Sequence, residues 1–67
     1  MQIQLNGRPY SVPDRVRTVG ELLSELGVQD SIVMVEQNGK ILEREEHPAS
    51  PLEENDQVEI VRFVGGG

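Results

Sequence analysis

The sequence contains no cysteine and no tryptophan, and it has only one tyrosine, Tyr10, and one phenylalanine, Phe63. Without cysteine it can form no disulfide, thiolate metal site or cysteine nucleophile. Two aromatic rings are too few for a platform on which nucleic-acid bases stack. Basic residues are also scarce, and the net charge is -6 at pH 7. Nucleic acids and anionic membranes repel such a chain, which is steered instead toward a basic protein surface.

Long apolar runs are missing as well. The first ten residues alternate polar and apolar side chains and lack the charged start and apolar block of a signal peptide, and no run is long enough to span a membrane. We therefore expect a cytoplasmic protein. A chain of 67 residues forms one domain with a small core. Its 36% hydrophobic and 27% charged residues are ordinary for a folded domain.

The first thirteen residues predict a hairpin. Residues 2–5 alternate as in a half-buried strand, and Asn6-Gly7 favours a tight turn because both residues accept positive φ. A second alternating stretch follows, with Pro9 and Pro13 at positions that cannot donate to a sheet. This second strand should lie at a sheet edge.

The next segment changes to a helical period. Thr18 is the expected N-cap, Glu21 completes a T-x-x-E capping box, and Gly27 fits the position just past the helix end. One helix face carries four apolar residues at spacings of three and four: Val19, Leu22, Leu23 and Leu26.

The second half predicts three more strands. The apolar run 32–35 indicates a central strand covered on both faces. Asn38-Gly39 predicts a second hairpin leading into a short strand at 40–42. Residues 43–56 are polar and predict a loop with at most one helical turn, anchored by Leu52 and ending in a turn at Asn55-Asp56. Residues 57–64 alternate as a last strand.

The order strand, strand, helix, strand, short strand, strand predicts an α+β domain of the β-grasp type. In it, one helix packs on one face of a mixed sheet of about five strands, because its leucine stripe must be buried. We place this domain at residues 1–63 and a flexible C-terminal glycine tail at 64–67. The predicted core is Ile3, Leu5, Val19, Leu22, Leu23, Leu26, Leu52 and Ile60.

The sequence gives little support for a metal site, a phosphate-binding loop or a catalytic site. A zinc site needs about three protein ligands, and His47 is the only histidine, so we interpret it as part of an exposed polar loop. The final Gly-Gly-Gly has no helix after it and cannot form a phosphate-binding loop. No serine–histidine arrangement has a plausible spacing, and twelve acidic residues fit a solvated surface better than a catalytic pair.

The glycine run itself is the remaining candidate. Gly65, Gly66 and Gly67 lack Cβ atoms and can enter a narrow channel. Counted from Val64, the four tail residues can reach roughly 13 Å beyond the fold. The Gly67 carboxylate could be adenylated by a partner enzyme and then converted to a thiocarboxylate. Taken alone, the run fits an unstructured stub equally well. Alternation also places Val61 and Phe63 opposite the core side of the last strand, where they either meet a partner or are covered by loop residues.

The chain resembles the ThiS family of sulfur carriers of thiamin thiazole synthesis. The strand order, the length and above all "DQVEIVRFVGGG" carry the resemblance, with "NGRPYSVP", "TVGELLSELG", "IVMVEQNGK" and "PLEENDQVEIVRFVGGG" falling at the first hairpin, helix, central hairpin and final strand. Asn55 stands where the family often has glycine, and it also tolerates left-handed backbone.

The resemblance implies a carrier rather than an enzyme. A ThiF-type enzyme would use ATP to adenylate Gly67, and a sulfur donor such as a cysteine desulfurase would supply the sulfur. A ThiG-type thiazole synthase would receive it. Gly65 and Gly66 would thread into these partners, and Val61, Phe63 and Val64 would contact them. The chain itself would need no metal or other cofactor and would bind neither nucleic acid nor membrane.

Three alternatives remain open from sequence. The first is the small subunit of molybdopterin synthase, also a β-grasp protein ending in Gly-Gly, although those chains tend to be longer. The second is a ubiquitin-like modifier joined to lysines of target proteins. The third is a non-covalent β-grasp adaptor. Each predicts a different partner for the C-terminal glycines.

Overall fold

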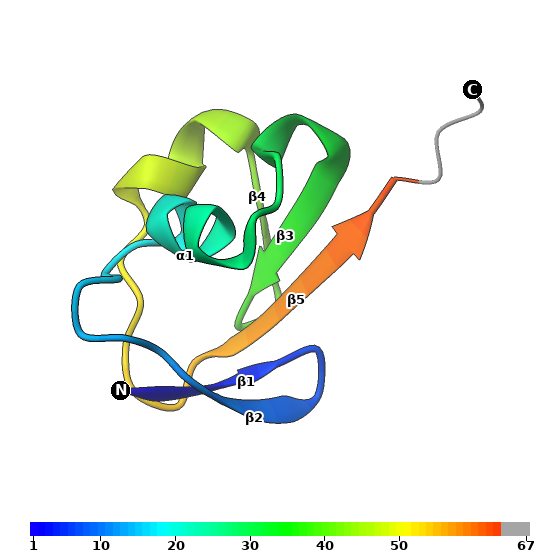
Figure 1. Cartoon of the computed structure of the whole chain (residues 1–67). Coiled ribbons are helices and arrows are strands. Elements are labelled where there is room, and N and C mark those ends of the chain that lie inside the picture. Colours follow the sequence, from blue (N-terminus) through cyan, green and yellow to red (C-terminus); the bar gives the residue numbers. More distant parts are fainter. Residues whose placement is uncertain (64–67) are drawn as a thin grey trace.

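A computed structural model describes residues 1–63 of the chain. Its strands form one five-stranded sheet in the order β2-β1-β5-β3-β4, in which β1 and β5 run parallel and the other neighbours antiparallel (Figure 1). The strands are β1 (Gln2–Leu5), β2 (Arg8–Ser11), β3 (Val33–Gln37), β4 (Lys40–Leu42) and β5 (Gln57–Arg62). The proline-bearing β2 lies at an edge, as the sequence predicts.

The helix α1 (Val19–Leu26) has the predicted ends. The Thr18 hydroxyl accepts a hydrogen bond from the Glu21 N–H at 3.1 Å, and a Glu21 carboxylate oxygen accepts one from the Thr18 N–H at 3.1 Å. Gly27 ends the helix at φ 72°, in left-handed backbone that glycine adopts without strain. The backbone N–H groups of Thr18 and Glu21 therefore both have hydrogen-bond partners within the first turn, as the capping box predicts.

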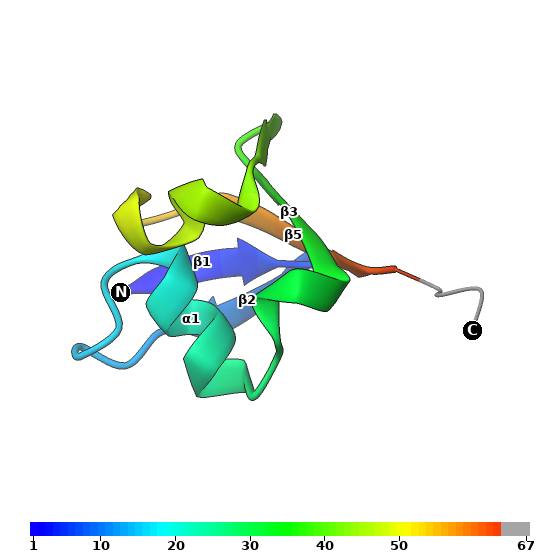
Figure 2. The same ribbon diagram turned by 90° about the horizontal axis from the view of Figure 1, so that it is seen from above.

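Two short 3-10 helices accompany α1: η1 (Asp30–Ile32) and η2 (Arg44–Ala49). The sequence predicted at most one helical turn in the polar stretch 43–56, but η2 extends over six residues. Figures 1 and 2 show η2 beside α1, over the same face of the sheet. The two come close because Gly20 has no side chain: a Cβ there would lie 3.1 Å from the Cα of Pro48.

The core lies between the sheet and this helical layer. Of the predicted core residues, Leu5, Leu26 and Ile60 are only partly buried and pack around its margin, whereas the other five are buried as expected. Further buried apolar residues complete it: Val12, Val16, Val33, Val35, Leu42 and Val58. Most of these come from strands, whose alternation hides a core residue in every second position.

The prediction for residues 32–35 was wrong in two respects, the cover of the strand and its place in the sheet. Val33 and Val35 are buried, but Met34 between them is only partly covered, and Ile32 belongs to η1 and is exposed. The run is therefore covered on one face, because no helix formed by residues 1–63 packs on the other side of the sheet. The strand is also not central, since β5 occupies the middle of the sheet.

The turns follow the sequence closely. Asn6, Asn38 and Asn55 all adopt positive φ, at 50°, 51° and 70°. Asparagine tolerates this conformation better than most residues, which explains why it occupies all three turns. Together, the two hairpins, the crossover helix and the parallel β1–β5 pair form the β-grasp fold that the sequence predicts.

Candidate functional site

The side of the sheet away from α1 carries the first candidate site. We call it the open face. The β3–β5 register places Met34 opposite Val61 on this face, and the next pair toward the end of β5 is Ile32 and Phe63, joined by a 2.8 Å backbone hydrogen bond. Ile41 of β4 lies on the same face one row earlier. We call the five side chains the apolar patch: Ile32, Met34, Ile41, Val61 and Phe63.

The apolar patch is unusually exposed. Val61 is 50% exposed, and Phe63 and Ile41 are each 57% exposed. The sequence predicted that Val61 and Phe63 lie opposite the core, and their exposure confirms this placement and shows that no loop within residues 1–63 covers them. Their contact with a partner stays a prediction. Exposed apolar clusters at one end of a sheet mark protein-binding surfaces more often than isolated apolar residues do.

Sequence reasoning missed Ile32, Met34 and Ile41 as members of the patch, and Met34 was missed because the apolar run 32–35 predicted cover on both faces. Ile41 could have been found, because a two-residue turn at Asn38-Gly39 fixes the register of β3 against β4 and sets Ile41 opposite Glu36. Ile32 could not, because its exposure follows from η1, which has no side-chain cap that a sequence pattern would reveal.

The other predicted site residues lie outside the described residues. These are Val64, Gly65, Gly66 and Gly67. The structure nevertheless shows how β5 is held just before them. Asn6, at the first hairpin turn, accepts a hydrogen bond from the Ile60 N–H at 2.7 Å through its side-chain oxygen, and its own N–H donates to the Val58 carbonyl at 2.9 Å. The β1 side of β5 is therefore fixed as far as Ile60.

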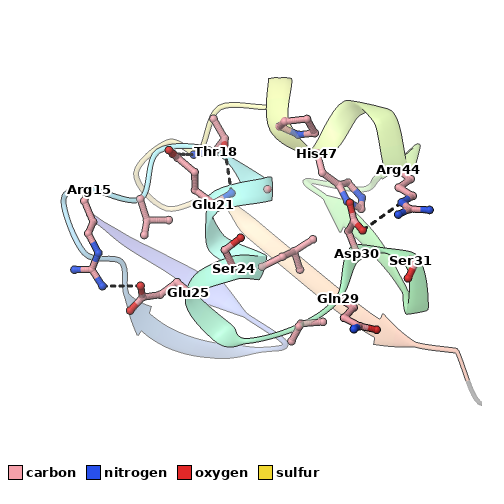
Figure 3. A pocket seen from close by; sticks show the side chains of 15 residues that line it. Arg15, Thr18, Glu21, Ser24, Glu25, Gln29, Asp30, Ser31, Arg44 and His47 are labelled. Atoms are coloured by element: carbon pink, nitrogen blue, oxygen red, sulfur yellow. Dashed lines mark hydrogen bonds and ion pairs between the residues drawn. The ribbon is translucent and has the colours of Figure 1, made fainter.

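A shallow groove on the helical side is the second candidate. It has a volume of about 1010 Å³ and runs between α1, η1 and η2 (Figure 3). Ion pairs lie along it: Arg15–Glu25 at 2.6 Å and Arg44–Asp30 at 3.2 Å. Both arginines of the groove thus have a carboxylate partner, and the third carboxylate of its lining, Glu21, accepts hydrogen bonds from the backbone N–H groups of Arg17 and Thr18. The groove therefore offers no unpaired arginine to bind an anionic ligand.

His47 lies at the floor of this groove and corrects a prediction. It was expected in an exposed polar loop, but it is 1% exposed, and neither ring nitrogen has a hydrogen-bond partner among the described residues. It packs as part of η2 against α1. Within residues 1–63 no group of three or more His, Cys, Asp or Glu residues could hold a metal ion.

A polar cluster at the opposite end of the sheet fixes the hairpin geometry. Asp56 is buried, and its carboxylate accepts hydrogen bonds from the side chains of Gln37 and Asn38, both at 2.9 Å, and from the Glu53 N–H at 2.8 Å. Burial by itself raises the pKa of Asp56, but the three donors outweigh it and hold the pKa below its ordinary value. This cluster joins the β3–β4 turn to the start of β5.

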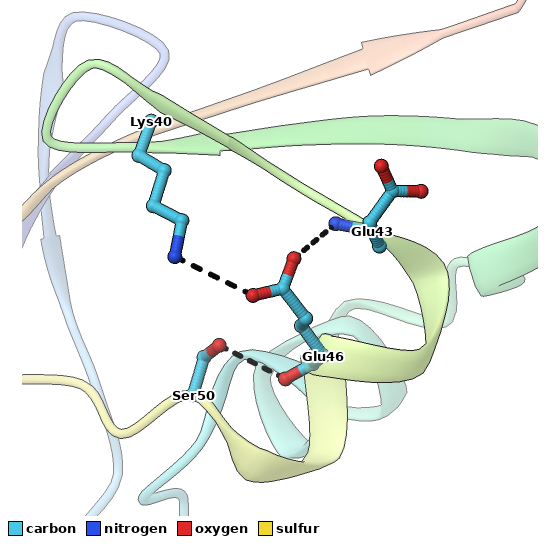
Figure 4. Close-up of polar contacts among 4 residues, drawn as sticks. All are labelled: Lys40, Glu43, Glu46 and Ser50. Atoms are coloured by element: carbon cyan, nitrogen blue, oxygen red, sulfur yellow. Dashed lines mark hydrogen bonds and ion pairs between the residues drawn. The ribbon is translucent and has the colours of Figure 1, made fainter.

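A smaller cluster supports η2 (Figure 4). The Glu46 carboxylate accepts a hydrogen bond from the Glu43 N–H at 2.7 Å and pairs with the Lys40 ammonium at 3.4 Å. The Glu43 N–H, more than the lysine charge, lowers the pKa of Glu46 from its ordinary value. Lys40 is the only lysine of the chain. Its pairing with Glu46 of η2 places its side chain on the helical side of the sheet, away from the open face.

No helix among residues 1–63 is long and apolar enough to cross a membrane.

Comparison with known proteins gives consistent matches. A model of the ThiS family matches residues 3–67. The "Sulfur carrier protein ThiS" of Bacillus subtilis is 37% identical over 65 residues, a match that covers 97% of this chain and 98% of that protein. A crystal structure of a thiamine biosynthesis protein (ThiS) from Geobacter metallireducens superimposes with a TM-score of 0.84 at 43% identity, covering 100% of both chains.

Two further relatives are much longer than this chain. Proteins named thiazole synthase from Magnetococcus marinus and Paramagnetospirillum magneticum are 40% and 36% identical to it over 67 residues. In each case the match covers all of this chain but only 20% of the relative. The chain therefore spans about a fifth of the length of these two proteins and nearly the full length of the Bacillus carrier.

Proposed function

This chain belongs to the ThiS family and is a sulfur carrier protein of thiamine biosynthesis, and from that premise we propose that it carries its sulfur as a thiocarboxylate on Gly67. The observation that supports the proposal best is the extent of the family match, which includes residue 67 and with it the whole glycine run. A glycine carboxylate offers an unhindered carbonyl carbon, because no Cβ stands beside the path of an attacking nucleophile.

The chemistry needs two steps at Gly67. A ThiF-type enzyme first joins a carboxylate oxygen to the α-phosphorus of ATP and releases pyrophosphate. A sulfide-level nucleophile then attacks the carbonyl carbon, a C–S bond forms, and AMP leaves with the electrons of the broken C–O bond. Where a cysteine desulfurase delivers the sulfur as a persulfide, a thiol must reduce the resulting acyl disulfide to free the thiocarboxylate.

The chain is a co-substrate in this scheme. ATP belongs to the activating partner, and a ThiG-type thiazole synthase accepts the sulfur from the thiocarboxylate in a pocket that excludes water. The two thiazole synthases that contain a segment matching this chain support the choice of that partner. We place these reactions in the cytoplasm.

The apolar patch is a surface that the partners can bind. Val61 in β5 and Phe63 just after this strand are exposed, and only Val64 separates Phe63 from the glycine run in the sequence. We propose that they and Val64 contact the partner while Gly65 and Gly66 pass through a channel too narrow for side chains. Apolar contact at the patch would position Gly67 and leave its carboxylate free to react.

Mass spectrometry tests the proposal. The chain is incubated with the ThiF-type enzyme encoded in the same genome, ATP and sulfide. We expect the intact mass to change by one oxygen replaced by sulfur, with the change located in the C-terminal peptide. Deletion of Gly67, or addition of a bulky residue after it, should abolish the change while leaving the thermal unfolding curve in place.

The other outcomes identify the alternatives. A modifier would form an amide with a lysine of another protein, and an adaptor would show no covalent change. If the mass stays constant while the same enzyme is active on another carrier, the thiocarboxylate proposal is wrong.

A further inference from the structure

Two carboxylates lie opposite each other on the open face, in the row that also holds Ile41 of the apolar patch. The β3–β5 register sets Glu36 directly opposite Glu59, one row from the Met34–Val61 pair. Like charges directly opposite in an antiparallel pair destabilise a sheet. Neither carboxylate belongs to any ion pair or side-chain hydrogen bond found among residues 1–63. The arrangement is therefore expected to cost the isolated domain stability, with no ion pair or side-chain hydrogen bond among residues 1–63 to offset that cost.

The strands separate their charges by face. Arg8, Lys40 and Arg62 are the basic residues of the strands, and register places each of them opposite Leu5, Gln37 or Val33, on the helix-covered side. Glu36 and Glu59 both lie on the open face. The open face therefore presents negative charge beside exposed apolar side chains, with no cation from a strand to neutralise it.

We propose that a basic side chain of the protein partner sits between Glu36 and Glu59 while the apolar patch packs against an apolar surface of that partner. The occupant is a protein, because a protein surface can place a basic side chain beside apolar side chains, which complements the two carboxylates and the apolar patch. An arginine suits the position best, since its planar guanidinium can bind two carboxylates at once. The inference rests on the proposed function for the identity of the partner, which we take to be the thiazole synthase.

Contact with the partner would turn the net electrostatic energy of Glu36 and Glu59 from unfavourable to favourable, because the attraction of both carboxylates to the cation would outweigh their mutual repulsion. In the free carrier the two charges repel each other, and in the complex both attract the same cation. Closure of the apolar patch also removes water from around the charges, which strengthens that attraction. The pair should therefore favour a basic partner surface and reject an acidic one.

The test compares two double variants of equal charge. Glu36→Gln/Glu59→Gln removes the facing carboxylates, and Asp14→Asn/Glu45→Gln removes two exposed carboxylates elsewhere on the chain. Affinity for the thiazole synthase encoded in the same genome is measured by calorimetry at low and high ionic strength. We expect the first variant to weaken binding at least about tenfold and to reduce its salt dependence, and the second to change the dissociation constant by less than about threefold.

Unfolding curves of the same proteins provide a readout that a structural role would not give. Glu36→Gln/Glu59→Gln should unfold at the same or a higher temperature than the unmodified chain, because repulsion is lost. Glu59→Lys should be more stable still, since it creates an attractive pair with Glu36, and yet it should bind more weakly. Stability and affinity thus move in opposite directions.

Three results would overturn the inference: unchanged affinity in the Glu36/Glu59 variant, equal weakening in both double variants, or a lowered melting temperature in the Glu36/Glu59 variant. Failure of the proposed function is recognised separately, by the mass of the unmodified chain after incubation with the activating enzyme. A chain that forms the thiocarboxylate but binds the synthase independently of Glu36 and Glu59 would refute only the inference.

Discussion

Replacing Asp56 by asparagine tests how the hairpin ends are held together. The carboxylate accepts three hydrogen bonds, two at one oxygen from Gln37 and Glu53 and one at the other oxygen from Asn38. Asparagine supplies one acceptor oxygen and one NH₂ group. In its better orientation the oxygen keeps the first two bonds, and the NH₂ group then faces the NH₂ group of Asn38.

Asn38 cannot relieve that contact by rotating its amide. Its side-chain oxygen already accepts a hydrogen bond from the Gln57 N–H at 2.9 Å, and a flip would exchange one lost bond for another. At least one hydrogen bond to a charged group is lost, and a lost bond of that kind costs about 1.5–3 kcal/mol. We therefore expect Asp56→Asn to lower the free energy of unfolding by about 2–3 kcal/mol, a large share for a domain this small.

The effect should depend on pH in a definite direction. The pKa of Asp56 is lowered in the folded state, so its contribution to stability is complete above the unfolded pKa of about 4 and is lost as the pH falls through the folded value. The gap between the unmodified chain and Asp56→Asn should be widest near neutral pH. It should close progressively below about pH 4.

Urea unfolding followed by far-UV circular dichroism measures this gap at a series of pH values. Asp14→Asn is the matched control, because Asp14 is exposed and takes part in no side-chain hydrogen bond or ion pair of the described residues. Its effect should stay within about 0.5 kcal/mol. An Asp56→Asn midpoint equal to that of the unmodified chain at pH 7, or a gap that widens in acid, would refute the reasoning.

Three further substitutions test the core, the helix contact and the open face. Leu23→Ala should cost about 2–5 kcal/mol in thermal unfolding because Leu23 is 1% exposed, and an unchanged melting curve would remove α1 from the core. Gly20→Ala should also destabilise the domain, because the added Cβ would meet backbone atoms of Pro48 and His47 at 3.1–3.3 Å and backbone gives way less easily than a side chain. We expect this overpacking to outweigh the gain of about 1 kcal/mol in helix propensity, so a stabilised variant would contradict the contact. Phe63→Ala should leave the unfolding temperature nearly unchanged while weakening binding to the synthase, and severe unfolding with normal binding per folded molecule would show that Phe63 is a core residue.

The parts of the fold that sequence predicts well are those decided by neighbouring residues. The capping box of α1 and the three asparagine turns need only a few residues, and each has a stereochemical reason that operates locally. The exposure of Val61 and Phe63 follows from simple alternation once the core side of β5 is known.

The parts that sequence predicts poorly depend on contacts between distant segments. The sequence around His47 is typical of a polar loop. Its burial results from the packing of η2 over Gly20, and no pattern of neighbouring residues predicts that contact. Glu36 and Glu59 come together only through the pairing of β3 with β5. The hydrogen bonds of Asp56 likewise cross from one hairpin to another strand.

The parallel pairing of β1 with β5 has a consequence for how the protein is made. Backbone hydrogen bonds of 2.8 Å from the Gln4 N–H to the Asp56 carbonyl and of 2.9 Å from the Asn6 N–H to the Val58 carbonyl join the first strand to the last. The middle of the sheet therefore cannot form until β5 has left the ribosome. Nascent chains that stop before β5 should be open to proteolysis. The pairing of β1 with β5 joins strands that are far apart in the sequence, and we expect this step to limit the rate of folding. A carrier with a complete sheet is thus one whose translation has passed β5, so partners that recognise the open face should not bind chains that lack this strand.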